Sequence, residues 1–148
     1  MMKNFKANGL PLLIGSLPMD NHEKATKLVL DYTPDIPLWV QLPVYKEEGM
    51  VPQFLPGLPG FDSTCGKNLL DTSKPEFEDE FLAFFEQYLS VTESGTDLGA
   101  SPFAFSGTRG KGFFEFLKQV DATDTPFAAL KGQVTGPITF GTAVKDEN

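Results

Sequence analysis

The chain has 148 residues, of which 41% are hydrophobic and 22% are charged, a balance typical of a folded globular protein. Acidic residues outnumber basic ones by 20 to 12 and give a net charge of -8, which argues against binding to nucleic acid or acidic lipid. Cys65 is the one cysteine in the sequence, so no intrachain disulfide can form, and a reducing cytoplasm is the expected location.

The N-terminal segment places lysines before an apolar run, as a signal peptide would. The run is short, and Pro11 and Gly15 interrupt it. No stretch approaches the roughly 20 consecutive apolar residues that a membrane span needs. We therefore expect a cytoplasmic protein with no membrane partner.

Three short apolar segments lack alternation and are typical of strands buried on both faces. They are LPLLI at 10–14, PLWVQLP at 37–43 and FAALKGQV at 127–134. Glycine- and proline-rich irregular segments are expected at 44–73 and 95–112, and a stretch as long as the first is usually functional.

Four helices are expected between and after these segments. The first follows a capping box of Asp20 and Glu23, and the second follows Ser73 as its N-cap. Helical spacing predicts a third helix over 113–120, and TGPITFGTAV at 135–144 predicts a fourth with a proline in its first turn. The second helix carries an apolar stripe of Phe77, Phe81, Phe84, Phe85 and Tyr88.

Strands without alternation, separated by amphipathic helices, favour a parallel sheet in an α/β architecture. Ligands in such folds bind outside the carboxyl ends of the strands. Polar residues stand at the ends of all three predicted strands and are candidate ligand-binding residues, namely Gly15 with Ser16, then Gln41, then Gln133 with Thr135. The alternative is that these residues only form turns.

The segments IGSLP at 14–18, PLWVQLP and LKGQVTGPIT at 130–139 occur in an order that resembles cobalamin-independent methionine synthase and uroporphyrinogen decarboxylase. The catalytic domains of that family are (β/α)₈ barrels. The resemblance implies an α/β fold, a partial (β/α)₈ TIM-barrel-like domain with parallel strands and flanking helices. Because such a barrel takes about 250 residues, 1–148 is too short to close it, and we expect a single domain that is the N-terminal part of a larger barrel.

The function implied by the resemblance is methyl transfer to a small-molecule thiol such as homocysteine. In methionine synthase the Ile-Gly-Ser backbone holds the amino-acid end of homocysteine, so Ile14, Gly15 and Ser16 are assigned that role by resemblance. The complete family domain uses zinc, whose ligands come from later strands. The resemblance therefore assigns no catalytic or metal-binding residue to this chain, and we expect the chain to be inactive by itself.

Outside these motifs, two residues are candidate soft metal ligands, His22 and Cys65. We expect His22 to be an exposed helix residue and Cys65 to be an unreactive loop thiol, because neither has a partner motif. The neighbouring Glu47 and Glu48 are expected to be solvated.

Two alternatives remain. One is a corrinoid-linked or uroporphyrinogen-decarboxylase-like enzyme, because Ala143 stands where methionine synthase has a tryptophan that stacks on its folate. Arg109 is the one arginine in the sequence, which argues against a porphyrinogen as the substrate. A non-catalytic half-barrel binding or assembly module is the other. Either way, open sheet edges predict a homo-oligomer.

Overall fold

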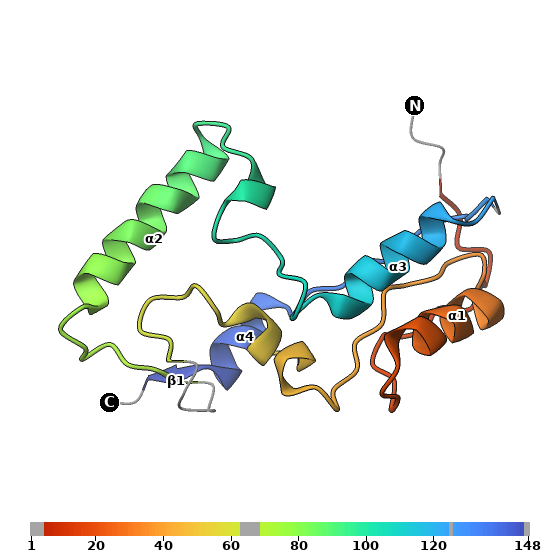
Figure 1. Cartoon of the computed structure of the whole chain (residues 1–148), viewed down its shortest axis with the longest axis horizontal. Coiled ribbons are helices and arrows are strands. Elements are labelled where there is room, and N and C mark those ends of the chain that lie inside the picture. Colours follow the sequence, from red (N-terminus) through yellow and green to blue (C-terminus); the bar gives the residue numbers. More distant parts are fainter. Residues whose placement is uncertain (1–4, 63–68, 125, 147–148) are drawn as a thin grey trace. The chain divides into compact units, whose positions relative to one another are not determined.

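The computed structural model describes residues 5–62, 69–124 and 126–146. Over these residues the chain forms four α-helices and one two-stranded parallel sheet (Figure 1). The helices are α1 (His22–Tyr32), α2 (Phe77–Thr92), α3 (Lys111–Asp121) and α4 (Pro137–Ala143). The strands are β1 (Leu69–Leu70) and β2 (Lys145–Asp146), with Leu69 paired to Lys145. Short 3₁₀ turns occur at Lys46–Glu48, Pro52–Phe54 and Leu98–Ala100.

The predicted fold class is wrong. A partial (β/α)₈ barrel requires several adjacent parallel strands, whereas the described residues are rich in helix and hold a single sheet of two short strands. Neither strand lies in a segment that was predicted to be one. The apolar runs predicted burial correctly at 37–42, whereas residues 11–14 are exposed. Burial alone does not create the continuous backbone pairing that defines a sheet.

The three segments predicted as strands nevertheless meet through isolated parallel bridges. One bridge joins Ser16 to Gln41, and another joins Leu38 to Lys131. The first rests on two backbone hydrogen bonds, Gln41 N–H to the Gly15 carbonyl at 3.0 Å and Leu17 N–H to the Gln41 carbonyl at 3.1 Å. The segment around 38–41 therefore lies between the other two.

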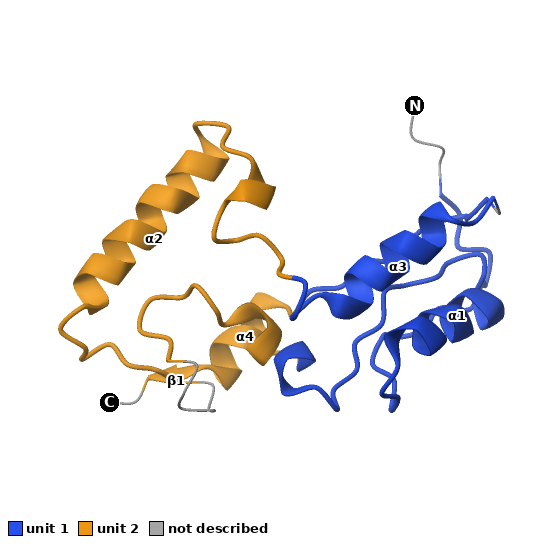
Figure 2. Cartoon of the chain, viewed as in Figure 1, with its two compact units in different colours: residues 1–49, 107–134 blue, residues 50–106, 135–148 orange. Residues whose placement is uncertain are grey.

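The chain divides into two compact units (Figure 2). Unit 1 consists of residues 1–49 and 107–134, and unit 2 consists of residues 50–106 and 135–148. Unit 1 thus holds α1, α3 and the three bridged segments, while unit 2 holds α2, α4 and the two-stranded sheet.

The core of unit 1 forms where α1 packs on the central bridged segment. Ala25 and Val29 of α1 contact Leu38, Val40 and Leu42, and all five side chains are fully buried. Burial of a leucine or valine side chain stabilises a fold by about 1.5–3 kcal/mol. Alternate residues of the central segment therefore hold α1 in place.

The start of α1 lies one residue later than the sequence predicted. Asn21, rather than Asp20, is the N-cap, and its side chain accepts the backbone N–H of Lys24 at 2.9 Å. Asn caps a helix as well as Asp does, so both neighbours were suitable. The Asp20 carbonyl is instead used by Tyr45, whose hydroxyl donates to it at 2.6 Å.

The N-terminus of α3 lies against the central segment of unit 1. A Cβ placed on Gly112 would be 2.0 Å from the Val40 carbonyl oxygen, so only glycine permits this approach. The Trp39 and Phe113 rings meet edge to face next to this contact, and Phe116 is buried. The predicted third helix is confirmed, with both of its ends extended.

In unit 2, α2 carries the predicted aromatic stripe but buries none of its residues. Its rings contact one another along the helix, Phe81 with Phe85 at 4.9 Å between centroids and Phe85 with Tyr88 at 6.5 Å. Ser73 does not cap α2, because its hydroxyl and N–H both donate to Asp71 in a turn that ends before the helix begins. Among the described helices, none combines the length and the apolar character needed to cross a bilayer.

Candidate functional site

Four residues of unit 1 form the candidate binding cluster, and they come from three separate parts of the sequence: Gly15, Gln41, Lys131 and Gln133. The Gln133 Nε2 donates to the Gln41 Oε1 at 3.0 Å, so two amide side chains 92 positions apart are joined directly. Gln41 is 9% exposed and Gln133 is half-buried. The structure thus brings together Gln41 and Gln133, two of the candidate ligand-binding residues, and their binding of a ligand stays a prediction.

Gly15 makes room for this amide pair. A Cβ on Gly15 would lie 2.1 Å from the Gln133 Nε2, and the backbone φ of +139° is one that side-chain-bearing residues rarely adopt. The glycine is therefore needed both for its backbone conformation and for the space it leaves. The absence of a side chain at Gly15 lets the Gln133 side chain pack against the backbone of this residue.

Lys131 adds a positive charge to the same cluster. Its Nζ donates to the carbonyl oxygens of Leu13 at 2.8 Å and of Ile14 at 2.7 Å. No described carboxylate forms an ion pair with it. An ammonium group has three N–H donors, and two of them are used by described residues.

Two of the predicted site residues lie at the surface beside this lysine. Ile14 is 87% exposed, and Ser16 is exposed as well. Within the described part of the chain, neither the hydroxyl nor the backbone N–H of Ser16 has a hydrogen-bond partner. Ser16 follows two residues after Ile14, whose carbonyl Lys131 contacts, and N–H, O–H and ammonium donors are groups that bind a carboxylate.

Thr135, the last of the predicted site residues, belongs to unit 2. Its hydroxyl donates to the carbonyl oxygen of Met50 in the same unit. That contact occupies the hydroxyl proton. Thr135 is thus not part of the cluster that the structure defines in unit 1.

A second polar group in unit 1 was not predicted. His22 is 5% exposed and Glu48 is 2% exposed, and the His22 Nε2 lies 2.5 Å from the Glu48 Oε1. The other oxygen of Glu48 accepts the Leu42 N–H at 3.0 Å, and the Tyr45 ring stacks on the imidazole at 5.3 Å. The expectations of an exposed His22 and a solvated Glu48 are therefore wrong. The partners are far apart in sequence, and no local pattern reveals such a pair.

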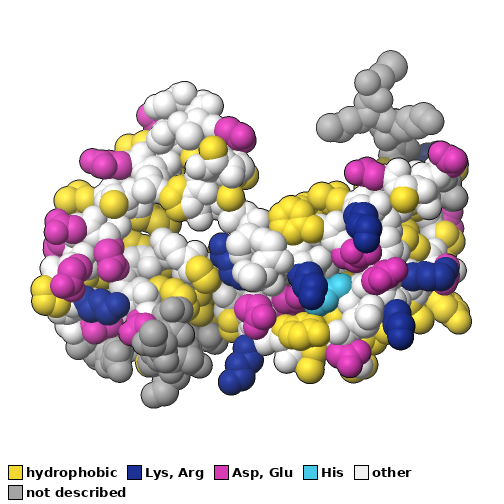
Figure 3. Space-filling model, viewed as in Figure 1, with side chains coloured by type: hydrophobic (Ala, Val, Ile, Leu, Met, Phe, Trp, Pro, Cys, Tyr) yellow, Lys and Arg dark blue, Asp and Glu magenta, His cyan; other side chains and the backbone are white. Residues whose placement is uncertain are grey.

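An open pocket of about 510 Å³ lies beside this pair, and Figure 3 shows basic and acidic side chains around the histidine. Lys111 and Lys118 contribute positive charge to its lining, and Asp20, Glu23 and Glu115 contribute negative charge. The hydrogen bond from Gln119 at 2.8 Å, assisted by Lys118, lowers the pKa of Glu115 below its ordinary value of 4.5, against the opposing effect of burial. The lining therefore carries charges of both signs, with three acidic side chains and two lysines.

The residues present do not fit a zinc centre. A catalytic zinc takes three protein ligands, and the described residues contain no group of three or more His, Cys, Asp or Glu side chains placed to bind a metal. The His22 Nε2 is engaged by Glu48. Cys65 lies outside the described residues.

The oligomer prediction presupposed a barrel-like sheet with long open edges, and that sheet is absent from the described residues. Association between copies of the chain stays a prediction.

No family model, no curated protein and no solved structure matches this chain. The function proposed below is therefore supported by the three sequence motifs and by the geometry of unit 1.

Proposed function

We propose that unit 1 is the substrate-binding part of a methionine-synthase-like methyltransferase and that it binds a small amino-acid thiol such as homocysteine. The chain itself contributes binding rather than chemistry. The single observation that carries the proposal is the hydrogen bond between Gln41 and Gln133 beside Gly15, which joins the three motifs on which the resemblance rests.

The carboxylate of the ligand is assigned to the donors around Ile14. Ser16 offers a backbone N–H and a hydroxyl, and Lys131 offers its ammonium group and a positive charge. Hydrogen bonds to an ionised group are roughly twice as strong as those between neutral groups. Binding should therefore depend on the ligand's carboxylate more than on any other part of it.

The amide pair fixes the position of these donors rather than contacting the carboxylate. The Gln133 side chain is held by Gln41 and approaches the Trp39 carbonyl at 3.5 Å. Trp39 is the one tryptophan in the sequence and is 5% exposed. Its ring contacts Phe113 of α3, so its fluorescence reports on the part of unit 1 that contains this cluster.

Titration calorimetry with L-homocysteine under reducing conditions tests the proposal, with Trp39 fluorescence as a second signal. We expect saturable binding, and we expect 3-aminopropane-1-thiol, which lacks the carboxylate, to bind at least about tenfold more weakly because it loses a charge-assisted contact. Absence of binding at millimolar homocysteine would contradict the proposal, as would equal binding of the two thiols.

Lys131→Met should weaken homocysteine binding by about tenfold, since hydrogen bonds to charged groups contribute about 1.5–3 kcal/mol. Lys24→Met is the matched control, because Lys24 is an exposed lysine of unit 1 outside the cluster. Ser16→Ala, at an exposed position that does not hold the fold together, gives a second variant if Lys131→Met alters folding. Equal effects of Lys131→Met and Lys24→Met would assign the binding to another part of the chain.

A further inference from the structure

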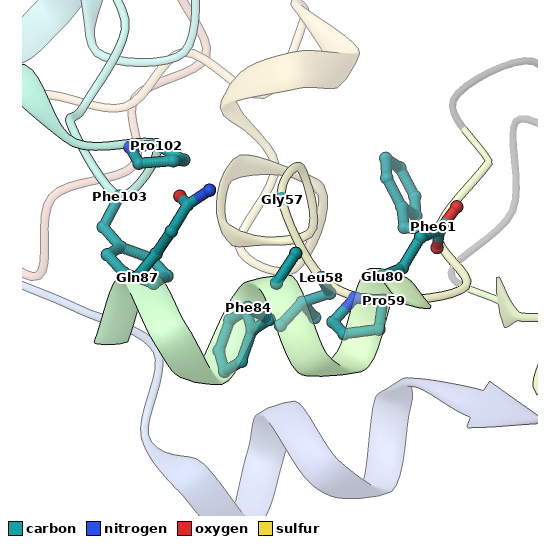
Figure 4. Close-up of a pocket in the computed structure, with 10 residues that line it drawn as sticks. Gly57, Leu58, Pro59, Phe61, Glu80, Phe84, Gln87, Pro102 and Phe103 are labelled. Atoms are coloured by element: carbon teal, nitrogen blue, oxygen red, sulfur yellow. The ribbon is translucent and has the colours of Figure 1, made fainter. Parts of the chain in front are cut away.

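Unit 2 contains an aromatic pocket of about 340 Å³ that the proposed function does not use (Figure 4). It lies between the loop at 57–61, one face of α2 and the turn at 102–103. Its size falls in the range of small-molecule sites. We propose that this pocket binds an organic ammonium ion with an apolar or aromatic body.

The two ends of the pocket differ in chemistry. Glu80, Phe84 and Gln87 lie along one face of α2, and seven residues of helix span about 10 Å. The Gly60 N–H donates to the Glu80 Oε2 at 2.7 Å, which places the next residue, Phe61, at the Glu80 end. Phe103 meets Phe84 edge to face at 5.3 Å toward the other end. Figure 4 shows Phe61 with Glu80 on one side and Phe103 with Gln87 on the other.

The Glu80 end is suited to a cation. Glu80 is the one charged side chain among the described residues that line the pocket, and no described residue is hydrogen-bonded to its Oε1. The Phe61 ring has no aromatic partner within the described ranges. A carboxylate and an aromatic ring at the same end of a pocket are groups that attract ammonium ions.

The remainder of the pocket is suited to an apolar body. Leu58, Phe84 and Phe103 supply aliphatic and aromatic surface, and Gln87 adds a neutral polar group at the far end. The segment 75–108 contains no lysine or arginine, while acidic residues recur along it. An anion would therefore meet repulsion here, and a neutral ligand would gain no charge-assisted contact with the Glu80 carboxylate.

Comparison of three probes of similar shape tests the charge preference on the unaltered chain. The probes are phenethylamine, 2-phenylethanol and phenylacetate, and their binding is measured by the NMR chemical-shift changes of residues in unit 2. We expect phenethylamine to bind about fivefold more tightly than 2-phenylethanol, the scale of one exposed ion pair, and phenylacetate to bind least. Equal binding of the three probes, or no binding of phenethylamine at 10 mM, would overturn the proposal.

Glu80→Gln removes the charge and keeps an oxygen that can accept the Gly60 N–H. We expect this variant to lose the preference for phenethylamine over 2-phenylethanol. Glu86→Gln is the matched control, because Glu86 is an exposed acidic residue of α2 that does not line the pocket. An equal loss in both variants would show that the general charge of α2, and not this pocket, attracts the amine. Circular dichroism of both variants checks that α2 is retained.

Discussion

His22 and Glu48, 26 positions apart in the sequence, share a hydrogen bond of 2.5 Å in the interior of unit 1. The pair joins the first turn of α1 to the 3₁₀ turn at Lys46–Glu48. Glu48 also accepts the N–H of Leu42, which lies in the core segment. One carboxylate therefore joins three parts of the unit, namely α1, the core segment and the 3₁₀ turn.

Glu48→Ala should destabilise the protein strongly. The substitution leaves a buried imidazole and a buried N–H without their acceptor, and loss of one partner from such a pair costs about 3–5 kcal/mol. Urea unfolding monitored by Trp39 fluorescence measures the change. Glu47→Ala is the control, since Glu47 is exposed and its replacement should change stability by less than about 0.5 kcal/mol. Similar losses in the two variants would contradict the structural role of the pair.

Gly112→Ala and Gly141→Ala should act in opposite directions, although both glycines lie in helices. At Gly112 a methyl group would lie 2.0 Å from the Val40 carbonyl oxygen, so α3 must move and we expect a loss of about 1–3 kcal/mol. At Gly141 of α4 no atom lies within 4 Å of the added group, and alanine should stabilise by about 0.5–1 kcal/mol. Thermal unfolding of each variant distinguishes the two outcomes, and a loss at both positions would contradict the packing of α3.

Glu115 should contribute to stability at neutral pH and lose that contribution in acid. Its folded-state pKa lies below the ordinary value of 4.5, chiefly because of the hydrogen bond from Gln119. The stabilisation is therefore present above about pH 4.5 and disappears as the pH falls through the folded-state value. Glu115→Gln should cost about 0.5 kcal/mol at pH 7, on the scale of partly exposed pairs, and less at pH 3. A difference that grew toward low pH would reverse the sign and contradict the assignment.

Gly15→Ala should damage the binding cluster by two separable effects. The φ of +139° is unfavourable for alanine, at a cost of about 1–3 kcal/mol, and the methyl group also collides with Gln133. In the double variant with Gln133→Ala the collision is removed, while the backbone cost and the loss of the Gln133–Gln41 hydrogen bond remain, so only part of the stability should return. Gly132→Ala is the control, because an added Cβ there meets no atom within 4 Å. The proposed role of Gly15 fails if the single and double variants unfold at the same urea concentration.

The helices were predictable because their signals are local. Apolar spacing located α3, and Pro137 marked the start of α4. The sheet was not predictable, since β1 and β2 have two residues each and pair across some 75 positions without turn or periodicity signals. The apolar runs indicated buried backbone correctly around 37–42, but an apolar run does not distinguish a strand from an extended buried segment.

The candidate site was partly predictable for a similar reason. Gln41 and Gln133 stood out as polar residues at the ends of apolar segments, and the structure joins them. Lys131 gave no such signal, because a lysine in a loop is ordinary until its partners are known. Thr135 was grouped with them by its place in a motif, yet the chain passes into unit 2 at that residue.

The division of the sequence between the two units has a consequence for biosynthesis. α1 belongs to the unit that is completed only by residues 107–134, so its packing partner α3 leaves the ribosome long after α1 itself. The apolar residues of α1 that pack on 38–42 can be covered early, but the surface of α1 that contacts α3 must stay uncovered while the whole of 50–106 is translated. A nascent chain stalled before residue 107 should accordingly be a strong client for a trigger-factor-like chaperone.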